Sequence, residues 1–167
     1  MADLTWKIKR FHDLTLEQLY GLLRLRTDVF VVEQNCPYPE LDGKDTHGET
    51  LHIMAVDPQG RPAGYLRILG PGVSYEDPSF GRVVVQKDYR GRGLSHELVD
   101  RAVAEMRRLW PGCPITIGAQ AHLETFYGGH GFVTVTESYL EDGIPHIDMT
   151  RTPVSRRPPL PHDRRLQ

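Results

Sequence analysis

The sequence predicts one domain of the mixed α/β (α+β) class, with a mostly antiparallel, twisted sheet of about seven strands flanked by helices. The chain has 167 residues, which is enough for one sizeable hydrophobic core. Seven runs have the composition or alternation of strands, and two long runs have helical character. Short turns join two pairs of neighbouring strand-like runs, as antiparallel hairpins require. These three observations together define the class.

The chain begins with a predicted strand and a long helix. Residues 4–11 alternate apolar and polar side chains, which is typical of a half-buried strand. Thr15 and Gln18 have the spacing of a capping box, in which each side chain bonds the backbone of the other residue. The leucine-rich stretch from Leu16 to about Val32 is therefore predicted to be helical.

A long loop and three strands are predicted next. Residues 35–50 contain two prolines and two glycines, which indicates a loop, or a loop around a short helical turn. A loop of this length inside a compact domain is more often functional than a short one. Residues 51–57 and 63–70 flank a turn signal and indicate a hairpin. The apolar end of residues 80–85 favours a strand that is buried on both faces.

The second half of the chain is predicted to contain two helices and three strands. Apolar residues between Leu94 and Leu109 follow the spacing of an amphipathic helix, which a Pro-Gly pair ends. The remaining predicted elements are a strand, a short helix and two further strands, at residues 115–121, 122–129, 132–140 and 144–151. Asp142-Gly143 between the last two strands is a hairpin signal.

Composition and charge restrict the function classes. The formal net charge of −2 gives no global reason to expect nucleic acid or an anionic membrane as a partner. Cys36 and Cys113 are far apart and provide neither a disulfide framework nor a zinc site, so no metal is expected. No signal peptide or membrane-spanning run is visible, which favours a cytoplasmic protein. Residues 152–167, rich in proline and arginine, are predicted to form a solvated tail, with nucleic-acid binding by its arginines as the alternative.

A glycine turn after the buried strand is the main functional signal. Arg90-Gly91-Arg92-Gly93 links a strand to a helix, where backbone N–H groups and the helix dipole favour an anion. Glycine lets a ligand approach the backbone, and arginine adds a guanidinium that matches phosphate geometry. The turn lacks the Gly-Lys-Ser/Thr ending of a Walker loop and the three spaced glycines of the dinucleotide fingerprint. It therefore predicts a phosphate site of another kind.

The order of elements and the motifs resemble the GNAT superfamily of acetyl-CoA-dependent N-acyltransferases. The turn from Arg90 to Ser95 is similar to that superfamily's Arg/Gln-x-x-Gly-x-Gly/Ala motif, except that Ser95 stands at the last position. FYGGHGF at 126–132 resembles its later aromatic-glycine motif. Three further segments resemble the ElaA-like branch, namely residues 25–34, 40–45 and 143–149. The resemblance covers residues 4–151 and implies a GNAT-type sheet that is splayed at the acetyl-CoA site.

The resemblance implies that the glycine turn holds the pyrophosphate of coenzyme A. It places the backbone N–H groups of Arg92 to His96 around the phosphates. It also implies that the pantetheine arm of coenzyme A pairs with the backbone of the buried strand. The implied cofactor-binding residues are Val83, Val84, Val85, Arg90, Gly91, Arg92, Gly93, Leu94, Ser95, His96 and Tyr127.

Catalytic roles follow from the resemblance and from the chemistry of acetyl transfer to an amine. The resemblance places Tyr127, on the short helix, where the family's general acid protonates the departing thiolate. It also implies that the Val85 N–H polarises the thioester carbonyl. Glu33 and His146 rank first as the base that receives the amine proton. The alternatives are a water relay and four other side chains, Asp42, His47, His52 and Glu137.

The predicted acceptor is a primary amine of a small molecule or of a protein. Four acids of the 35–50 loop are expected to give a cationic substrate a favourable field, namely Glu40, Asp42, Asp45 and Glu49. Arg26-x-x-Val29-Phe30 resembles the opening motif of acyl-homoserine-lactone synthases, but the tryptophans that follow in that family are missing here. A non-catalytic acyl-CoA-binding or regulatory module is the alternative of a different class. The sequence leaves open whether the chain forms a homodimer.

Overall fold

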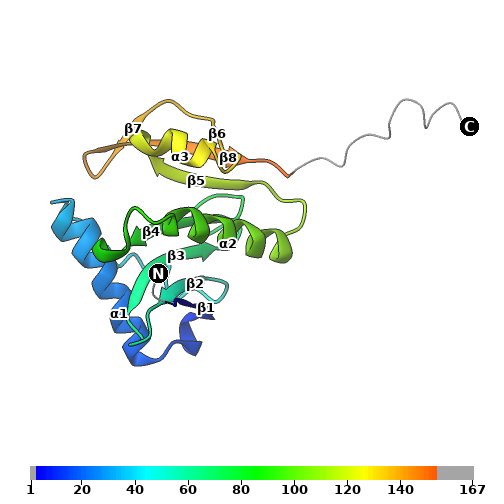
Figure 1. Cartoon of the computed structure of the whole chain (residues 1–167). Helices are drawn as coiled ribbons and strands as arrows, with labels where there is room; N and C mark the ends of the chain where they lie inside the picture. Colours follow the sequence, from blue (N-terminus) through cyan, green and yellow to red (C-terminus); the bar gives the residue numbers. More distant parts are fainter. Residues whose placement is uncertain (1–2, 154–167) are drawn as a thin grey trace, which may run out of the picture.

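The computed structural model describes residues 3–153, in which eight strands form two antiparallel sheets. The first sheet has the order β1 (Thr5–Arg10), β2 (Leu51–Val56), β3 (Pro62–Leu69) and β4 (Ser79–Val85). The second has the order β5 (Ile115–Gln120), β8 (Ile144–Arg151) and β6 (Val133–Thr134), with β7 (Tyr139–Glu141) also paired to β8. Figure 1 shows that β4 and β5 face each other where the two sheets meet. From residue 154 onward, the predicted tail lies outside the described residues.

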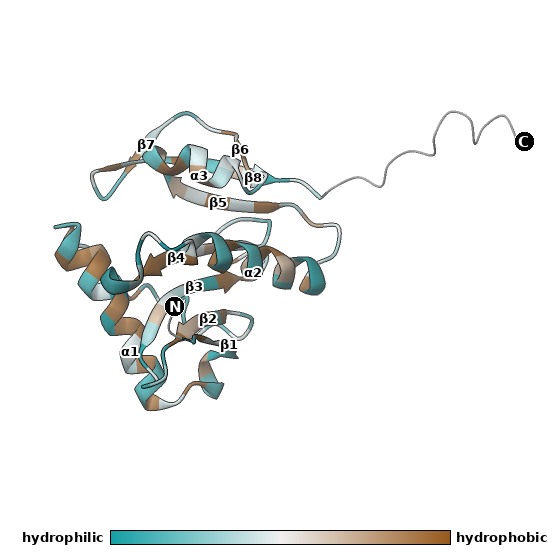
Figure 2. Cartoon of the chain, viewed as in Figure 1, coloured by the Kyte–Doolittle hydropathy of each residue, from teal (hydrophilic) through white to brown (hydrophobic). Residues whose placement is uncertain are grey.

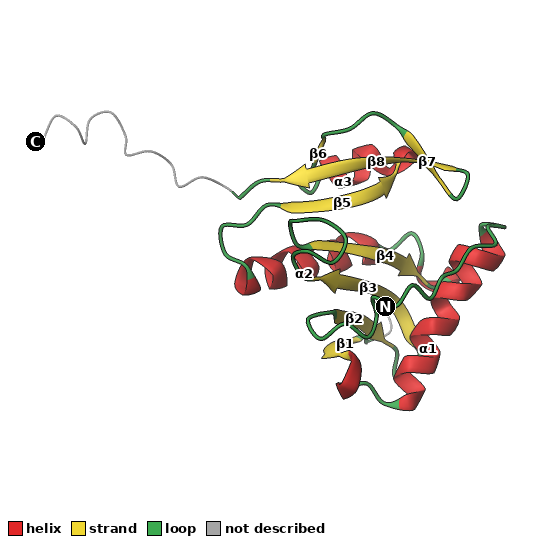
Figure 3. Cartoon of the chain, turned by 180° about the vertical axis from the view of Figure 1, so that it is seen from behind, coloured by secondary structure: helices red, strands yellow, loops and turns green. Residues whose placement is uncertain are grey.

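Two long helices cover opposite faces of the first sheet. α1 (Leu16–Arg26) continues into a π-helical segment, η2 (Thr27–Glu33), and α2 (Leu94–Leu109) lies on the other face, as Figures 1 and 3 show from two sides. Thr15 and Gln18 exchange the hydrogen bonds of the predicted capping box. The remaining helical segments are η1 (Phe11–Asp13), η3 (Lys87–Tyr89), η4 (Ala121–Leu123) and α3 (Glu124–Gly128). Within residues 3–153, each helix is too short or too polar to cross a membrane.

Alternation along β2 supplies apolar side chains to both faces of the first sheet. Ile53 packs in the cluster that contains Leu98 of α2, whereas Met54 packs in the cluster that contains Leu22 of α1. Because successive strand side chains point to opposite faces, one continuous apolar strand serves both helices. Figure 2 shows apolar residues on β2, β3 and β4 between the two helices.

The last hairpin is confirmed, and the strand before it is divided. Asp142 and Gly143 have φ values of 49° and 78°, as a type I′ turn between β7 and β8 requires. The predicted strand at 132–140 is split into β6 and β7. The Asp148 N–H donates to the Thr136 hydroxyl instead of a backbone carbonyl, so a side chain interrupts the ladder there.

β4 and β5 start side by side and then diverge. The Thr116 N–H donates to the Pro78 carbonyl at 3.2 Å, after which β4 pairs with β3 and β5 pairs with β8. β4 has one extra residue between its pairings with Tyr65 and Arg67, which makes a β-bulge at Arg82. The φ of Arg82 is 54°, which is unusual for a residue with a Cβ. Because a bulge bends its strand, it contributes to the divergence of β4 from β5.

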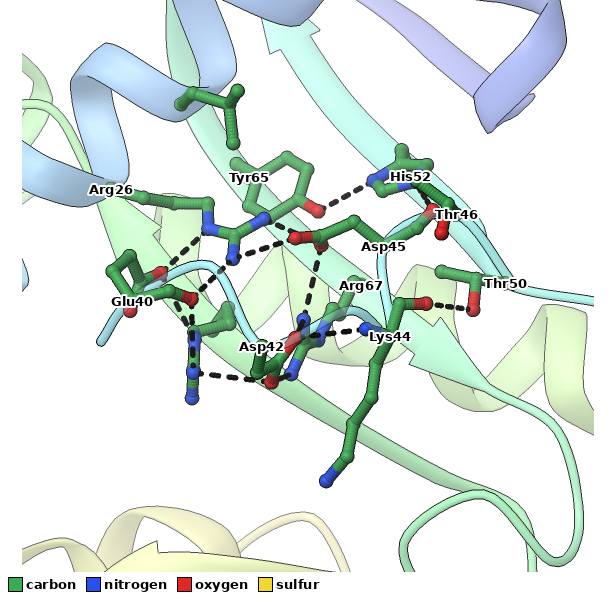
Figure 4. Close-up of polar contacts among 12 residues, drawn as sticks. Arg26, Glu40, Asp42, Lys44, Asp45, Thr46, Thr50, His52, Tyr65 and Arg67 are labelled. Atoms are coloured by element: carbon green, nitrogen blue, oxygen red, sulfur yellow. Dashed lines mark hydrogen bonds and ion pairs between the residues drawn. The ribbon is translucent and has the colours of Figure 1, made fainter.

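A closed ring of ion pairs fixes the long loop at 35–50 to the first sheet. Three arginines from α1, β3 and β4 alternate in space with three carboxylates of the loop. In order around the ring, the members are Arg26, Glu40, Arg82, Asp42, Arg67 and Asp45. Figure 4 shows most of these side chains and their contacts. We call this group the ion ring.

The inner part of the ion ring is buried. Arg26 donates from Nε to Glu40 Oε1 at 2.7 Å and from Nη1 to Asp45 Oδ1 at 2.7 Å. Arg67 donates from Nη1 to the same Asp45 oxygen at 3.0 Å. Removing one member of a buried ion pair leaves an uncompensated charge, which costs ~3–5 kcal/mol. The ion ring therefore determines the course of a loop that has no regular secondary structure.

The outer part of the ion ring is partly exposed. Arg67 Nη1 donates to Asp42 Oδ1 at 2.8 Å, and Arg82 Nη2 lies 3.4 Å from Asp42 Oδ2. The side chains of Asp42 and Arg82 are 22% and 24% exposed. Burial alone would raise the pKa of Asp42, but the hydrogen bond and charge of Arg67 outweigh burial and hold that pKa well below its ordinary value. This carboxylate therefore stays ionised at neutral pH.

A buried histidine joins the loop to β3. His52 Nε2 lies 3.0 Å from the Asp45 carbonyl oxygen, so Nε2 carries the proton and donates. His52 Nδ1 then accepts from the Tyr65 hydroxyl at 2.6 Å. Burial lowers the pKa of His52. The fold therefore holds His52 in its neutral form.

We expect the free energy of unfolding to fall in two stages as the pH decreases from neutrality. The pKa of His52 is lowered in the folded state, so below about pH 6.5 the unfolded chain binds a proton that the folded protein does not. Burial would raise the pKa of Asp45, but the hydrogen bond and charge of Arg26 outweigh burial and lower it. Because the pKa values of Asp45 and Asp42 are both lowered in the folded state, a second loss of stability begins below about pH 4. Urea denaturation across this range measures both stages.

His52→Gln is expected to remove the first stage and keep the second. His12→Gln, which replaces an exposed histidine, is the matched control and is expected to keep both. A free energy of unfolding that stays constant from neutrality to about pH 4 would contradict the assignment of His52 as a buried neutral residue.

Candidate active site

The divergence of β4 and β5 opens a cavity of about 610 Å³. Small-molecule sites have volumes of roughly 300–1,000 Å³, so this cavity suits a small ligand. Phe80 and Gly81 of β4 and Ile117 and Ala119 of β5 line it. The loop at 35–50 contributes to one wall, and the turn between β7 and β8 contributes to another. The cavity thus lies where the two sheets separate.

Tyr127 of α3 borders the cavity with a side chain that is otherwise buried. It is 6% exposed and packs against Phe80, Phe126 and Phe132. Within residues 3–153, its hydroxyl makes no hydrogen bond. Burial raises the pKa of Tyr127 to about 12, so the hydroxyl keeps its proton at neutral pH. A protonated donor is therefore available at the edge of the cavity.

The end of β4 has backbone groups that point away from the first sheet. The Gln86 N–H donates to the Ala63 carbonyl at 2.8 Å, so it faces β3. Successive residues of an antiparallel strand direct these groups alternately toward and away from the partner strand, so those of Val85 point away from β3. The Val85 carbonyl accepts from Arg90 Nε at 3.1 Å. This orientation suits the predicted role of the Val85 N–H, which stays a prediction.

The glycine turn leads into α2 with its backbone open to solvent. Gly91 and Gly93 have φ values of 76° and 80°, which favour glycine, and a Cβ at either position would meet no atom within 4 Å. Gly93 is the N-cap of α2 and has no side chain to bond the first-turn N–H groups. Arg92 is exposed and lies over the ring of Tyr89, 5.9 Å from its centre. Open N–H groups, a helix N-terminus and an exposed guanidinium fit a phosphate group.

Arg90 and Glu33 pair with each other. Arg90 Nη2 donates to Glu33 Oε2 at 2.7 Å, and Arg90 Nη1 donates to the other carboxylate oxygen. The hydrogen bond from Arg90 lowers the pKa of Glu33. An efficient general base needs a pKa near the working pH, so this pairing argues against the role predicted for Glu33. It also turns Arg90 toward η2, which leaves Arg92 as the guanidinium beside the glycine turn.

Of the two first-ranked bases, Glu33 and His146, it is His146 that borders the cavity. Its Nδ1 lies 2.7 Å from the Ile144 carbonyl oxygen, so Nδ1 carries a proton and donates. Its Nε2 lies 3.5 Å from Glu141 Oε2 and has a lone pair in the neutral form. The arrangement suits a group that receives a proton at the cavity.

The other predicted bases are less well placed. His52 is fully buried, and Asp42 is engaged in the ion ring. His47 and Glu137 are exposed and do not border the cavity. Among residues 3–153, no cluster of three or more His, Cys, Asp or Glu side chains could hold a metal ion.

The negative field expected from the loop is absent, which corrects the sequence-based expectation. Glu40, Asp42 and Asp45 are each paired with arginines of the ion ring. Three positive and three negative charges cancel there. The fourth acid, Glu49, does not border the cavity. A cationic substrate therefore gains no general electrostatic attraction from this loop.

Three basic side chains on one side of the cavity were not predicted from the sequence. Lys44, Arg67 and Arg82 all line it. The sequence contained one signal of them, because Arg67 lies inside the apolar run Ala63–Leu69 and so indicates a buried charge that needs a partner. A second missed feature is a histidine pair beside the glycine turn, in which His96 Nδ1 lies 2.9 Å from His130 Nε2.

Comparisons with known proteins show the family of the chain. Residues 25–153 match the family model of the acetyltransferase (GNAT) domain. Protein ElaA of Escherichia coli is 43% identical over 146 residues, which are 87% of this chain and 95% of ElaA. The crystal structure of E. coli ElaA has a TM-score of 0.83 over 89% of this chain and 99% of that chain, at 42% identity. An acyl-CoA N-acyltransferase from Pseudomonas aeruginosa has a TM-score of 0.85 over 90% and 100%, at 51% identity.

A CoA-dependent acyl-homoserine lactone synthase, BjaI, is a more distant structural neighbour. It has a TM-score of 0.73 over 93% of this chain and 85% of that chain, at 18% identity. An identity this low shows a shared fold and nothing about substrates. The family model, in contrast, covers residues 25–153. E. coli ElaA and the P. aeruginosa protein are 43% and 51% identical over most of this chain. The chain therefore belongs to the GNAT family of acyltransferases.

Proposed function

We propose that the chain is an acetyl-CoA-dependent N-acetyltransferase that transfers an acetyl group to a primary amine of a small molecule or a protein by direct attack on the thioester. One observation carries the proposal. The cavity between β4 and β5 is bordered by Tyr127 and by β4 as far as Val83, and the end of β4 leads through η3 to the open glycine turn. The P. aeruginosa relative, an acyl-CoA N-acyltransferase, supports an acyl-CoA as the donor.

The residues at the turn and along β4 fit coenzyme A. The N–H groups of Arg92 to His96 would hold the pyrophosphate, because Gly91 and Gly93 leave the backbone open and Arg92 adds a positive charge. The backbone of Val83 to Val85 would hold the pantetheine arm. Bound acetyl-CoA supplies an acetyl group activated as a thioester.

Three groups of the chain have the chemistry that acetyl transfer needs. The Val85 N–H would stabilise negative charge that develops on the carbonyl oxygen. The Tyr127 hydroxyl, which stays protonated at neutral pH, would donate a hydrogen bond to the developing thiolate. His146 Nε2, directly or through water, would take the proton that the amine releases. The pKa of Tyr127 is higher than the pKa of a free thiol, which is about 8.5, so the tyrosine keeps its own proton. The proton that the thiolate finally gains is therefore the one that the amine releases.

Replacing Gly93 by aspartate tests the cofactor site. Gly93→Asp forces a side chain into a backbone with a φ of 80° and places a negative charge where we expect phosphate. We expect calorimetric titration to show that acetyl-CoA binds the native protein and binds Gly93→Asp about 100-fold more weakly. Gly60→Asp is the matched control, because Gly60 has a φ of 82° in the β2–β3 turn, away from the cavity. Equal affinity of the Gly93→Asp and Gly60→Asp variants would contradict the site.

Replacing Tyr127 by phenylalanine tests the catalytic assignment. We expect Tyr127→Phe to lower kcat about 100-fold or more, because only the hydroxyl is removed. The Kd for acetyl-CoA is expected to stay within about twofold, because the ring and its packing are kept. Stopped assays of thiol release measure kcat, and Tyr20→Phe, at an exposed position of α1, is the control. A wild-type protein that binds acetyl-CoA but acetylates no amine would instead support the non-catalytic module.

A further inference from the structure

The charges around the cavity do not all cancel one another. The ion ring lines the cavity through Asp42, Arg67 and Arg82, and its members cancel one another. Lys44 also lines the cavity, and within residues 3–153 its ammonium has no carboxylate at ion-pair distance. Lys44 Nζ donates to the Ser74 hydroxyl at 2.8 Å. One positive charge therefore remains on this side of the cavity.

The fold holds Lys44 in place. Its N–H donates to Asp42 Oδ1 at 3.0 Å, and its carbonyl accepts from the Thr50 hydroxyl at 2.7 Å. The neighbouring Asp45 is fixed by two arginines of the ion ring. Figure 4 shows the Lys44 side chain extending away from the ion ring, so that its ammonium is separate from the ring's charges. Because the backbone is already ordered, a ligand that meets this ammonium does not have to order the loop.

The turn between β7 and β8 brings negative charge to the same cavity. Glu141 and Asp142 both line it, and the Asp142 carbonyl accepts from the Cys36 thiol at 3.6 Å. Among residues 3–153, the ion-pair partner of the Glu141 carboxylate is His146 Nε2 at 3.5 Å, and this histidine is charged only when protonated. The cavity thus has a cation on the loop wall and carboxylates on the hairpin wall. A molecule that carries both an amine and an anion complements it.

We propose that the acceptor is a small amine that also carries a carboxylate, as an amino acid does, and that Lys44 binds this carboxylate. The inference rests on the proposed acetyltransferase function and names its substrate class. One free ammonium matches the single charge of a carboxylate, whereas a phosphate of about −1.5 to −2 would remain partly unbalanced. The cavity of about 610 Å³ is large enough for an amino acid.

Matched pairs of amines that differ in one carboxylate test the inference. Suitable pairs are lysine and cadaverine, and phenylalanine and phenethylamine, with phosphoethanolamine and ethanolamine as the phosphate arm. Thiol release from acetyl-CoA gives kcat/KM, and ligand-observed NMR with the CoA-saturated protein gives binding. We expect the carboxylate-bearing member of at least one pair to be preferred about tenfold or more, mainly through KM.

Variants of Lys44 test whether this residue causes the preference for carboxylate-bearing amines. Lys44→Met is expected to lower the preference about tenfold and to leave the Kd for acetyl-CoA within about twofold, whereas Lys44→Arg keeps the charge and retains most of the preference. Lys7→Met, on β1 and outside the cavity lining, is the matched control and is expected to retain all of it. Equal thermal unfolding of the variants excludes a folding effect.

The outcomes separate the inference from the proposed function. If amines are acetylated without a carboxylate preference, or if the preference survives in Lys44→Met, the inference is overturned and the function stands. A larger preference in the phosphate pair overturns the choice of a carboxylate. If every carboxylate-bearing amine fails both to bind and to react, the inference is overturned. If acetyl-CoA also fails to bind, the proposed function falls with it.

Discussion

The shape of the candidate site depends on the ion ring. Ordering a loop of sixteen residues without regular structure costs conformational entropy, which favourable contacts must offset. Arg26 supplies part of it, because its fully buried guanidinium requires both Glu40 and Asp45 as partners. The carboxylates in turn fix the loop as a wall of the cavity and determine where Lys44 stands. The course of the loop and the position of the proposed carboxylate-binding Lys44 thus rest on the same contacts.

β4 links the ion ring to the proposed cofactor site. Its bulge places Arg82 in the ion ring, its middle residues line the cavity, and its end directs the Val85 backbone away from β3. Arg90, which follows β4, bonds the Val85 carbonyl and the Glu33 carboxylate together. The end of the first helical region is therefore tied to the strand beside the glycine turn.

Local patterns in the sequence predicted the elements but not the charge partners. The periodicity of Leu94–Leu109, the capping box at Thr15 and the Asp-Gly turn at 142–143 act over a few residues, so one sequence is sufficient to find them. The pairing of loop acids with arginines of α1, β3 and β4 depends on tertiary distances, which no local pattern contains. For the same reason, the pairing of Glu33 with Arg90 could not be foreseen from the sequence. The division of 132–140 was missed because a side chain, Thr136, replaces a backbone acceptor.

Amide chemical-shift mapping during titration with coenzyme A tests the central claim most directly, because it reports the position of the ligand without requiring a known acceptor. The account predicts that the largest shifts occur at the amides of residues 83–85 and 91–96, with smaller shifts around Tyr127 of α3. The first turn of α1 and the strand β1 are expected to be unaffected. Largest shifts outside residues 83–96 and α3, or no shifts at saturating coenzyme A, would contradict the assignment of the diverging strands and the glycine turn as the cofactor site.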